Sequence, residues 1–154
     1  MHDAANLNPC DVVVVGAGAS GCLAALRSAE GGLSVLLLDR GTSKPSLTAI
    51  CGGLIPGVDT EFQRAAGIRD SVDLFVADVL AKNKDRADLP VLRAVAQATA
   101  RYIAFITGPL AIPLHLYTDI LHPGLSVPRL HGTAGESGLE LQTCLLYTSP
   151  SPRD

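Results

Sequence analysis

Three glycines, Gly16, Gly18 and Gly21, stand between a β-branched run and a segment rich in alanine and leucine. In a turn of this spacing, the first glycine allows a tight bend, the second lets a pyrophosphate approach the backbone, and the third lets a helix pack closely on a strand. The start of that helix offers free N–H groups and the positive end of the helix dipole to phosphate charge. Asp39 lies 23 residues after Gly16, where a carboxylate can accept hydrogen bonds from ribose hydroxyls. The spacing predicts a dinucleotide-binding site formed by Asp39 and by the whole turn, Gly16, Ala17, Gly18, Ala19, Ser20 and Gly21; the alternative is a glycine turn that only packs one element on another.

The elements that must position these residues follow from the surrounding pattern. Val12–Val15 is a β-branched run without alternation, which is typical of a strand buried on both faces of a parallel sheet. Ala19–Glu30 has helical composition, Gly31-Gly32 supplies a left-handed C-cap, and Leu33–Leu38 is a second buried strand. Strand, helix and strand within about thirty residues predict a Rossmann-like βαβ unit, and hence an α/β fold.

Two stretches of the remaining chain predict loops. Residues 41–57 are rich in Gly, Ser, Thr and Pro, and residues 122–138 contain two prolines and four glycines. Between them, Pro113–Tyr117 alternates apolar and polar side chains, which predicts a strand.

Capping residues predict the starts of three helices. Thr60 with Gln63 three residues later forms the pattern of a capping box, and Asp70 or Ser71 can start a helix over Val72–Ala81. Asp88 can cap the third helix. One face of that helix is predicted to contain Leu92, Val95, Tyr102, Ile103 and Ile106, with Thr99 as a polar member.

The segment after Asp39 and Arg40 is a long polar loop that ends in Cys51-Gly52-Gly53. This acid followed by a Gly-Gly loop resembles the succinate dehydrogenase/fumarate reductase flavoprotein family. The resemblance implies FAD as the cofactor, with the loop running along the pyrophosphate to the flavin ring and adding the candidate contacts Arg40, Thr48, Cys51, Gly52 and Gly53. Membrane-bound members of the family bind FAD covalently through a histidine, and the matching position here is Ser46, so noncovalent FAD is expected.

The resemblance also divides the chain. It implies the N-terminal part of an FAD-binding Rossmann-like domain over residues 10–57, a mainly helical segment leading to the substrate region over 58–126, and the start of the return to the FAD domain over 127–143. Val127-Pro-Arg129-Leu-His131, with Gly135 and Ser137-Gly138, is similar to the corresponding family segment. The implied activity is hydride transfer between flavin and a CH–CH or C=C bond beside a carboxylate or carbonyl of a small-molecule substrate. The family's catalytic Arg and His residues have no counterpart before Thr143, so catalytic residues are not assigned.

The last eleven residues, 144–154 (CLLYTSPSPRD), differ in character from the rest of the chain. A transposon end used in the preparation of sequencing libraries encodes them residue for residue, so we interpret them as a sequencing-adapter artefact and expect a domain truncated near Thr143. A natural Ser/Pro-rich tail is the alternative.

Two further alternatives concern the function of the protein: an NAD(P)-dependent dehydrogenase in which Arg40 meets a 2′-phosphate, and a truncated polypeptide without function.

Composition excludes several classes of protein. A formal net charge of −3 without a concentration of Lys and Arg argues against nucleic-acid binding. The apolar runs are too short or too interrupted for a membrane span, and the first ten residues do not have the pattern of a secretion signal, so a cytoplasmic location is expected. The four cysteines are scattered and His115, His122 and His131 fit no standard ligand spacing, so no metal site is expected and the histidines are placed in loops or at the surface.

Overall fold

The computed structural model describes residues 9–41, 46–119 and 121–147. It contains the predicted βαβ unit: β1 (Val12–Val15) and β2 (Val35–Leu38) pair in parallel, with Val12 opposite Val35 and Val15 opposite Leu38. Helix α1 (Ala19–Glu30) connects them and has the predicted bounds. The left-handed residue after α1 is Gly32, with φ of +83°, whereas Gly31 has φ of −73°.

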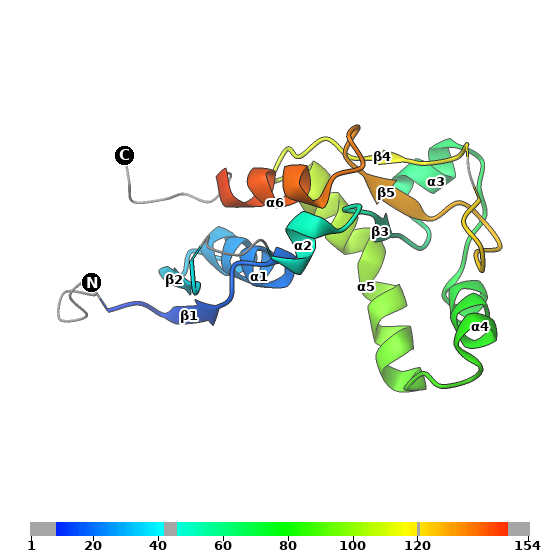
Figure 1. Cartoon of the computed structure of the whole chain (residues 1–154), viewed down its shortest axis with the longest axis horizontal. Helices are drawn as coiled ribbons and strands as arrows, with labels where there is room; N and C mark the ends of the chain where they lie inside the picture. Colours follow the sequence, from blue (N-terminus) through cyan, green and yellow to red (C-terminus); the bar gives the residue numbers. More distant parts are fainter. Residues whose placement is uncertain (1–8, 42–45, 120, 148–154) are drawn as a thin grey trace.

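The expectation that β1 is buried on both faces is wrong. Helix α1 packs against one face of the two-stranded sheet (Figure 1). On the other face, Val13 and Val15 are 54% and 82% exposed. A run of four valines contains no alternation, so it could not indicate that only one face is covered.

A second sheet forms from three short antiparallel strands in the order β3-β5-β4. They are β3 (Ile55–Pro56), β4 (His115–Leu116) and β5 (Leu130–Gly132). Strand β4 lies within the predicted strand 113–117, but β3 and the short helix α2 (Leu47–Ile50) occupy the predicted loop 41–57, and β5 occupies the predicted loop 122–138. Strands of two or three residues have no readable period, and they form here because they pair with partners distant in sequence.

The three predicted helix starts are confirmed. Helix α3 (Glu61–Ala65) has the capping box of Thr60 and Gln63, α4 (Val72–Asn83) is capped by Ser71, and α5 (Leu89–Thr107) by Asp88. Helix α4 extends two residues beyond Ala81. The predicted buried face of α5 is wrong at Val95, which is 50% exposed; the buried face instead continues through Ala96, Thr99, Ile103 and Ile106, spaced by three and four residues.

Helix α6 (Gly138–Tyr147) returns the chain to the βαβ unit (Figure 1). Its buried Leu141 and Leu145, one turn apart, join a core cluster with Cys22, Leu23 and Leu26 of α1 and with Ile106 at the end of α5. Residues 144–147, which we interpret as adapter-derived, continue this helix, and that interpretation stays a prediction. Within the residues that are described, no helix has both the length and the apolar character needed to cross a bilayer.

Candidate functional site

The glycine turn joins β1 to α1, and two of its glycines are required by the backbone itself. Gly16 has φ of +104° and donates its N–H to Leu38 O at 2.7 Å. A Cβ on Gly21 would lie 1.8 Å from Gly16 O, so only glycine allows α1 to approach the turn this closely. Gly18 is different, because its φ of −72° is ordinary and the nearest atom to a Cβ there would be Thr48 Oγ1 at 3.6 Å. A methyl group at Gly18 would therefore fit at the N-terminus of α1, in ordinary contact with Thr48.

Asp39, at the end of β2, reaches across to the same turn. Its Oδ2 accepts a hydrogen bond from Ala17 N at 2.7 Å and its Oδ1 accepts one from Gly41 N at 3.0 Å. These two amides, that of Ala17 first, lower the pKa of the Asp39 carboxyl below its ordinary value. Each carboxylate oxygen keeps a further lone pair for a hydroxyl donor.

A hollow of about 440 Å³ lies beside this carboxylate. It is lined by Val15 and Gly16 from the end of β1 and the turn, and by Leu38, Asp39 and Arg40 from the end of β2. The carboxyl ends of parallel strands are where open α/β sheets bind ligands. Arg40 thus lines the predicted site, whereas the side chain of Ser20 is exposed on the first turn of α1.

Thr48 brings the long loop back to the N-terminal end of α1. Its Oγ1 accepts a hydrogen bond from Ala19 N, the first residue of α1, at 3.0 Å. The hydroxyl proton of Thr48 is free to be donated to an anion. Ser46 caps α2 by accepting from Ala49 N at 3.1 Å and so fixes the short helix that carries Thr48.

The Gly52-Gly53 loop packs on the start of α6. Gly53 has φ of +65°, and a Cβ there would lie 2.9 Å from Gly138 N and from Ser137 O. Gly138 N donates to Cys51 O at 2.9 Å, and a Cβ on Gly138 would lie 1.8 Å from Thr48 O. Cys51 itself is exposed. The segment that the resemblance placed at the return to the domain therefore does contact the predicted cofactor loop.

One site residue was missed by the sequence reasoning. Gln142 of α6 donates from Nε2 to Ala17 O at 2.9 Å, and its Oε1 accepts a hydrogen bond from the Ser46 hydroxyl. The only local signal is that Gln142 follows Gly138 by four residues, which places both on one face of α6. No motif distinguishes a glutamine in that position.

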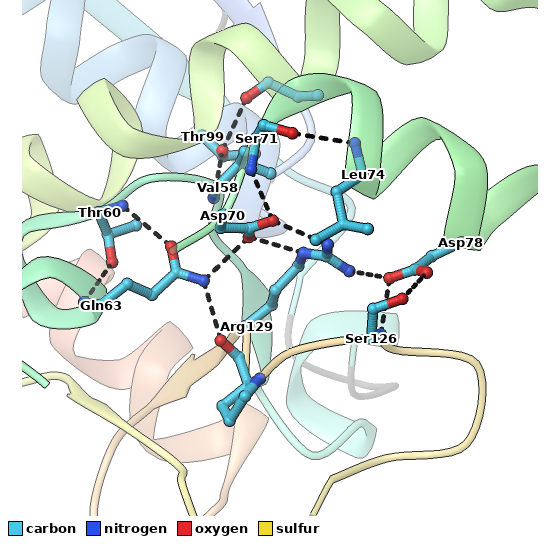
Figure 2. A network of polar contacts seen from close by, with 12 residues as sticks. Val58, Thr60, Gln63, Asp70, Ser71, Leu74, Asp78, Thr99, Ser126 and Arg129 are labelled. Carbon is cyan, nitrogen blue, oxygen red and sulfur yellow. Dashed lines mark hydrogen bonds and ion pairs between the residues drawn. The ribbon is translucent and has the colours of Figure 1, made fainter. Parts of the chain in front are cut away.

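A second group of polar side chains is buried away from the glycine turn, between α3, α4 and β5 (Figure 2). Arg129 is completely buried and forms a two-point ion pair with Asp70, from Nε at 2.7 Å and from Nη2 at 2.8 Å, and a further one with Asp78. Burial by itself would lower the pKa of Arg129, but its hydrogen bonds with the two carboxylates raise it above the ordinary value. Gln63 completes the group by donating to Asp70 at 3.0 Å and to Pro128 O at 2.9 Å.

The expectation that His131 lies in a loop or at the surface is wrong. His131 is in β5 and completely buried, with Nδ1 2.8 Å from Arg129 O and Nε2 3.0 Å from Thr60 Oγ1. Because a carbonyl can only accept, we assign the proton to Nδ1, and Nε2 then accepts from the Thr60 hydroxyl. Burial lowers the pKa of His131, so the ring is neutral and both nitrogens are engaged. Among the described residues, no group of three or more metal-ligating side chains is gathered.

Comparison with known proteins identifies what this arrangement is similar to. A family model described as an FAD binding domain matches residues 11–127. The acrylate reductase flavoprotein subunit of Shewanella woodyi is 32% identical over 137 residues, which cover 88% of this chain and 27% of that protein. The urocanate reductase of Eggerthella lenta is 41% identical over 70 residues, which cover 46% of this chain and 12% of that protein.

Solved structures agree with these relatives. The open conformation of a flavocytochrome c3 fumarate reductase superposes with a TM-score of 0.77 at 26% identity, covering 95% of this chain and 26% of that chain. The chain thus spans about a quarter of the length of the acrylate reductase subunit and of the fumarate reductase.

Proposed function

Because the chain belongs to the family of FAD-binding domains of flavoprotein oxidoreductases, whose cofactor is FAD, we propose that its glycine turn, Asp39 and Thr48 hold the ADP end of that cofactor. The observation that carries the proposal is their convergence. Asp39 and Thr48, from the ends of different elements, bond to the backbone of Ala17 and Ala19 within one turn. The match to an FAD-binding domain favours FAD over the NAD(P) alternative.

The residues fit the polar half of FAD. The N–H of Ala19 is bonded to Thr48, but the next N–H groups of α1 have no partners within the helix and are available to the pyrophosphate, which can approach over Gly18 because that residue has no side chain. Asp39 offers lone pairs to the ribose, and the hollow beside it receives the adenosine. The Thr48 hydroxyl donates toward the phosphates, and residues 51–53 continue toward the flavin.

We also propose that FAD binds without a covalent bond. Ser46, where covalent members have histidine, caps α2 and donates its proton to Gln142. Its hydroxyl is therefore engaged in holding the loop, and an alcohol is a poor nucleophile without a neighbouring base.

For the whole protein, we propose an oxidoreductase that transfers a hydride between flavin and a CH–CH or C=C bond beside a carboxylate or carbonyl. Relatives named as acrylate, urocanate and fumarate reductases support this substrate class. FAD would supply the hydride chemistry. The residues of this chain bind and orient the cofactor, and we expect the catalytic Arg and His in chain beyond Thr143. A cytoplasmic location also remains a proposal.

Two experiments test these proposals. Recovery of the intact gene tests the oxidoreductase: it should encode a further flavin-binding segment and Arg/His active-site motifs after the position of Thr143, and a gene without them would refute it.

Titration of the chain with ADP, followed by amide chemical shifts, tests the site: shifts should centre on residues 16–21 and 39–41. Absence of binding would instead favour a truncated polypeptide without function, an alternative supported by the exposed faces of Val13 and Val15.

A further inference from the structure

One side chain connects the two loops that the proposed cofactor would contact. The amide of Gln142 donates to Ala17 O in the glycine turn and accepts from Ser46, which caps the helix that leads into residues 51–53. Its two partners are far away in sequence, at separations of 125 and 96 residues from Gln142. Gln142 is half-buried, so both hydrogen bonds are partly shielded from water.

Helix α6 holds this glutamine in a fixed place. At the helix start, Gly138 N bonds to Cys51 O and leaves no room for a side chain against Thr48 O. On the inner face of α6, Leu141 and Leu145 are buried in the core with α1. The position of Gln142 relative to both loops is therefore determined by packing and not by its own flexible side chain.

We propose that Gln142 is a positioning residue. It fixes the position of residues 51–53 relative to the glycine turn, and so favours a cofactor long enough to contact both. This inference rests on the proposed function, since it needs the turn to bind the ADP end. Without Gln142, Ala17 stays held, because its N–H still donates to Asp39 and its carbonyl still accepts from the Cys22 thiol at 3.3 Å. The second loop loses its link through Gln142 and keeps only the hydrogen bond from Ala19 N to Thr48 Oγ1. FAD, which spans both, should therefore be weakened more than ADP, which needs only the turn.

The experiment compares dissociation constants for FAD and ADP in the full chain and in variants. Gln142→Met removes both hydrogen bonds at nearly constant size, and Gln97→Met, at an exposed position of α5, is the matched control. In Gln142→Met we expect FAD binding to weaken about tenfold and ADP binding to change less than about twofold. Gln97→Met should leave both constants as in the unmodified chain.

Ser46 supplies an independent pair of variants in case Gln142→Met does not fold. Ser46→Ala removes both the hydrogen bond to Gln142 and the cap of α2, and should shift the ratio of FAD to ADP affinity in the same direction. Ser46→Thr keeps the hydroxyl for both bonds and should restore the ratio. A purely structural role would lower the melting temperature and leave the ratio unchanged. Folded variants that lose FAD and ADP affinity equally, or lose neither, overturn the inference but not the proposed function. An unmodified chain that binds neither ligand overturns both.

Discussion

Replacement of Arg129 by methionine should remove a large part of the stability of this chain. The guanidinium is completely buried and is the cation shared by Asp70, whose side chain is also completely buried, and by Asp78, whose side chain is 10% exposed. Methionine has a similar length, so the main loss is that of charge and hydrogen bonds and not of volume. Two carboxylates then stay in a poorly hydrated site without a cation. Breaking a buried ion pair from one side typically costs about 3–5 kcal/mol, out of a total of about 5–15 kcal/mol for a domain of ordinary stability.

The loss should depend on pH in a defined direction. In the unmodified chain, burial would raise the pKa of Asp78, but hydrogen bonds from Arg129 and Ser126 outweigh it and lower the pKa below the ordinary value. A carboxyl with a lowered folded pKa stabilises the protein above its unfolded pKa, near 4, and the contribution disappears as pH falls through the folded pKa. In Arg129→Met, burial and the neighbouring carboxylate raise the folded pKa, so protonation relieves the variant as pH falls. The difference in stability is therefore largest at pH 7 and shrinks toward pH 4.

Urea unfolding followed by circular dichroism at pH 7 and pH 4.5 measures both effects. Arg93→Met is the matched control, because Arg93 pairs with Asp73 at 2.8 Å on the surface, with side chains 49% and 81% exposed. An exposed pair of this kind should contribute no more than about 1 kcal/mol. The reasoning is refuted if Arg129→Met is no less stable than Arg93→Met at pH 7, or if its deficit is as large at pH 4.5 as at pH 7.

Three further changes separate the tasks of the glycine turn. Gly21→Ala places a Cβ 1.8 Å from Gly16 O and should destabilise the chain by about 3 kcal/mol in urea unfolding; a variant as stable as the unmodified chain would contradict the packing role. Gly18→Ala has room for its methyl group, so its stability in urea should equal that of the unmodified chain. It should nevertheless weaken ADP binding about tenfold, because the methyl group lies where the phosphates approach. Unchanged affinity would show that the phosphates lie elsewhere. Asp39→Asn should weaken ADP about tenfold, and because the Asp39 pKa is lowered, FAD affinity of the unmodified chain should be equal at pH 5 and pH 8. An Asp39→Asn variant that binds ADP as tightly as the unmodified chain would show that this carboxyl is not the ribose ligand.

The features that could be predicted from the sequence are those whose cause is local. The glycine turn requires particular backbone angles and close approaches within six residues, and the caps at Thr60, Ser71 and Asp88 each bond to an amide three residues on. In all of these the chemistry and the geometry lie in one short segment. A sequence pattern can therefore indicate them without knowledge of the tertiary structure.

The features that were missed depend on partners distant in the chain. Strand β5 exists because β3 and β4 pair with it, across separations that no local period reports. His131 is buried in β5, where its ring nitrogen bonds to Thr60, from 71 residues earlier in the chain. Gln142 belongs to the site only because α6 packs against α1 and α2. The same reason explains the error at β1, whose covered face is decided by the position of a helix and not by its own four valines.

Hydrogen-bond saturation decides which polar groups are free to act on a ligand. Arg129 and His131 are residue types that commonly perform catalysis, but the three guanidinium nitrogens each bond to a carboxylate and both nitrogens of the histidine ring are bonded. A neutral imidazole with both nitrogens bonded is not available for proton transfer, and a completely buried guanidinium paired with two carboxylates is not accessible to a substrate carboxylate. At the glycine turn the balance is the opposite, because the helix N-terminus, the Asp39 carboxylate and the Thr48 hydroxyl all keep unused capacity. The distribution of unused hydrogen-bonding capacity thus supports the proposal that ligand binds at the end of the βαβ unit and that the buried Arg129 and His131 serve stability.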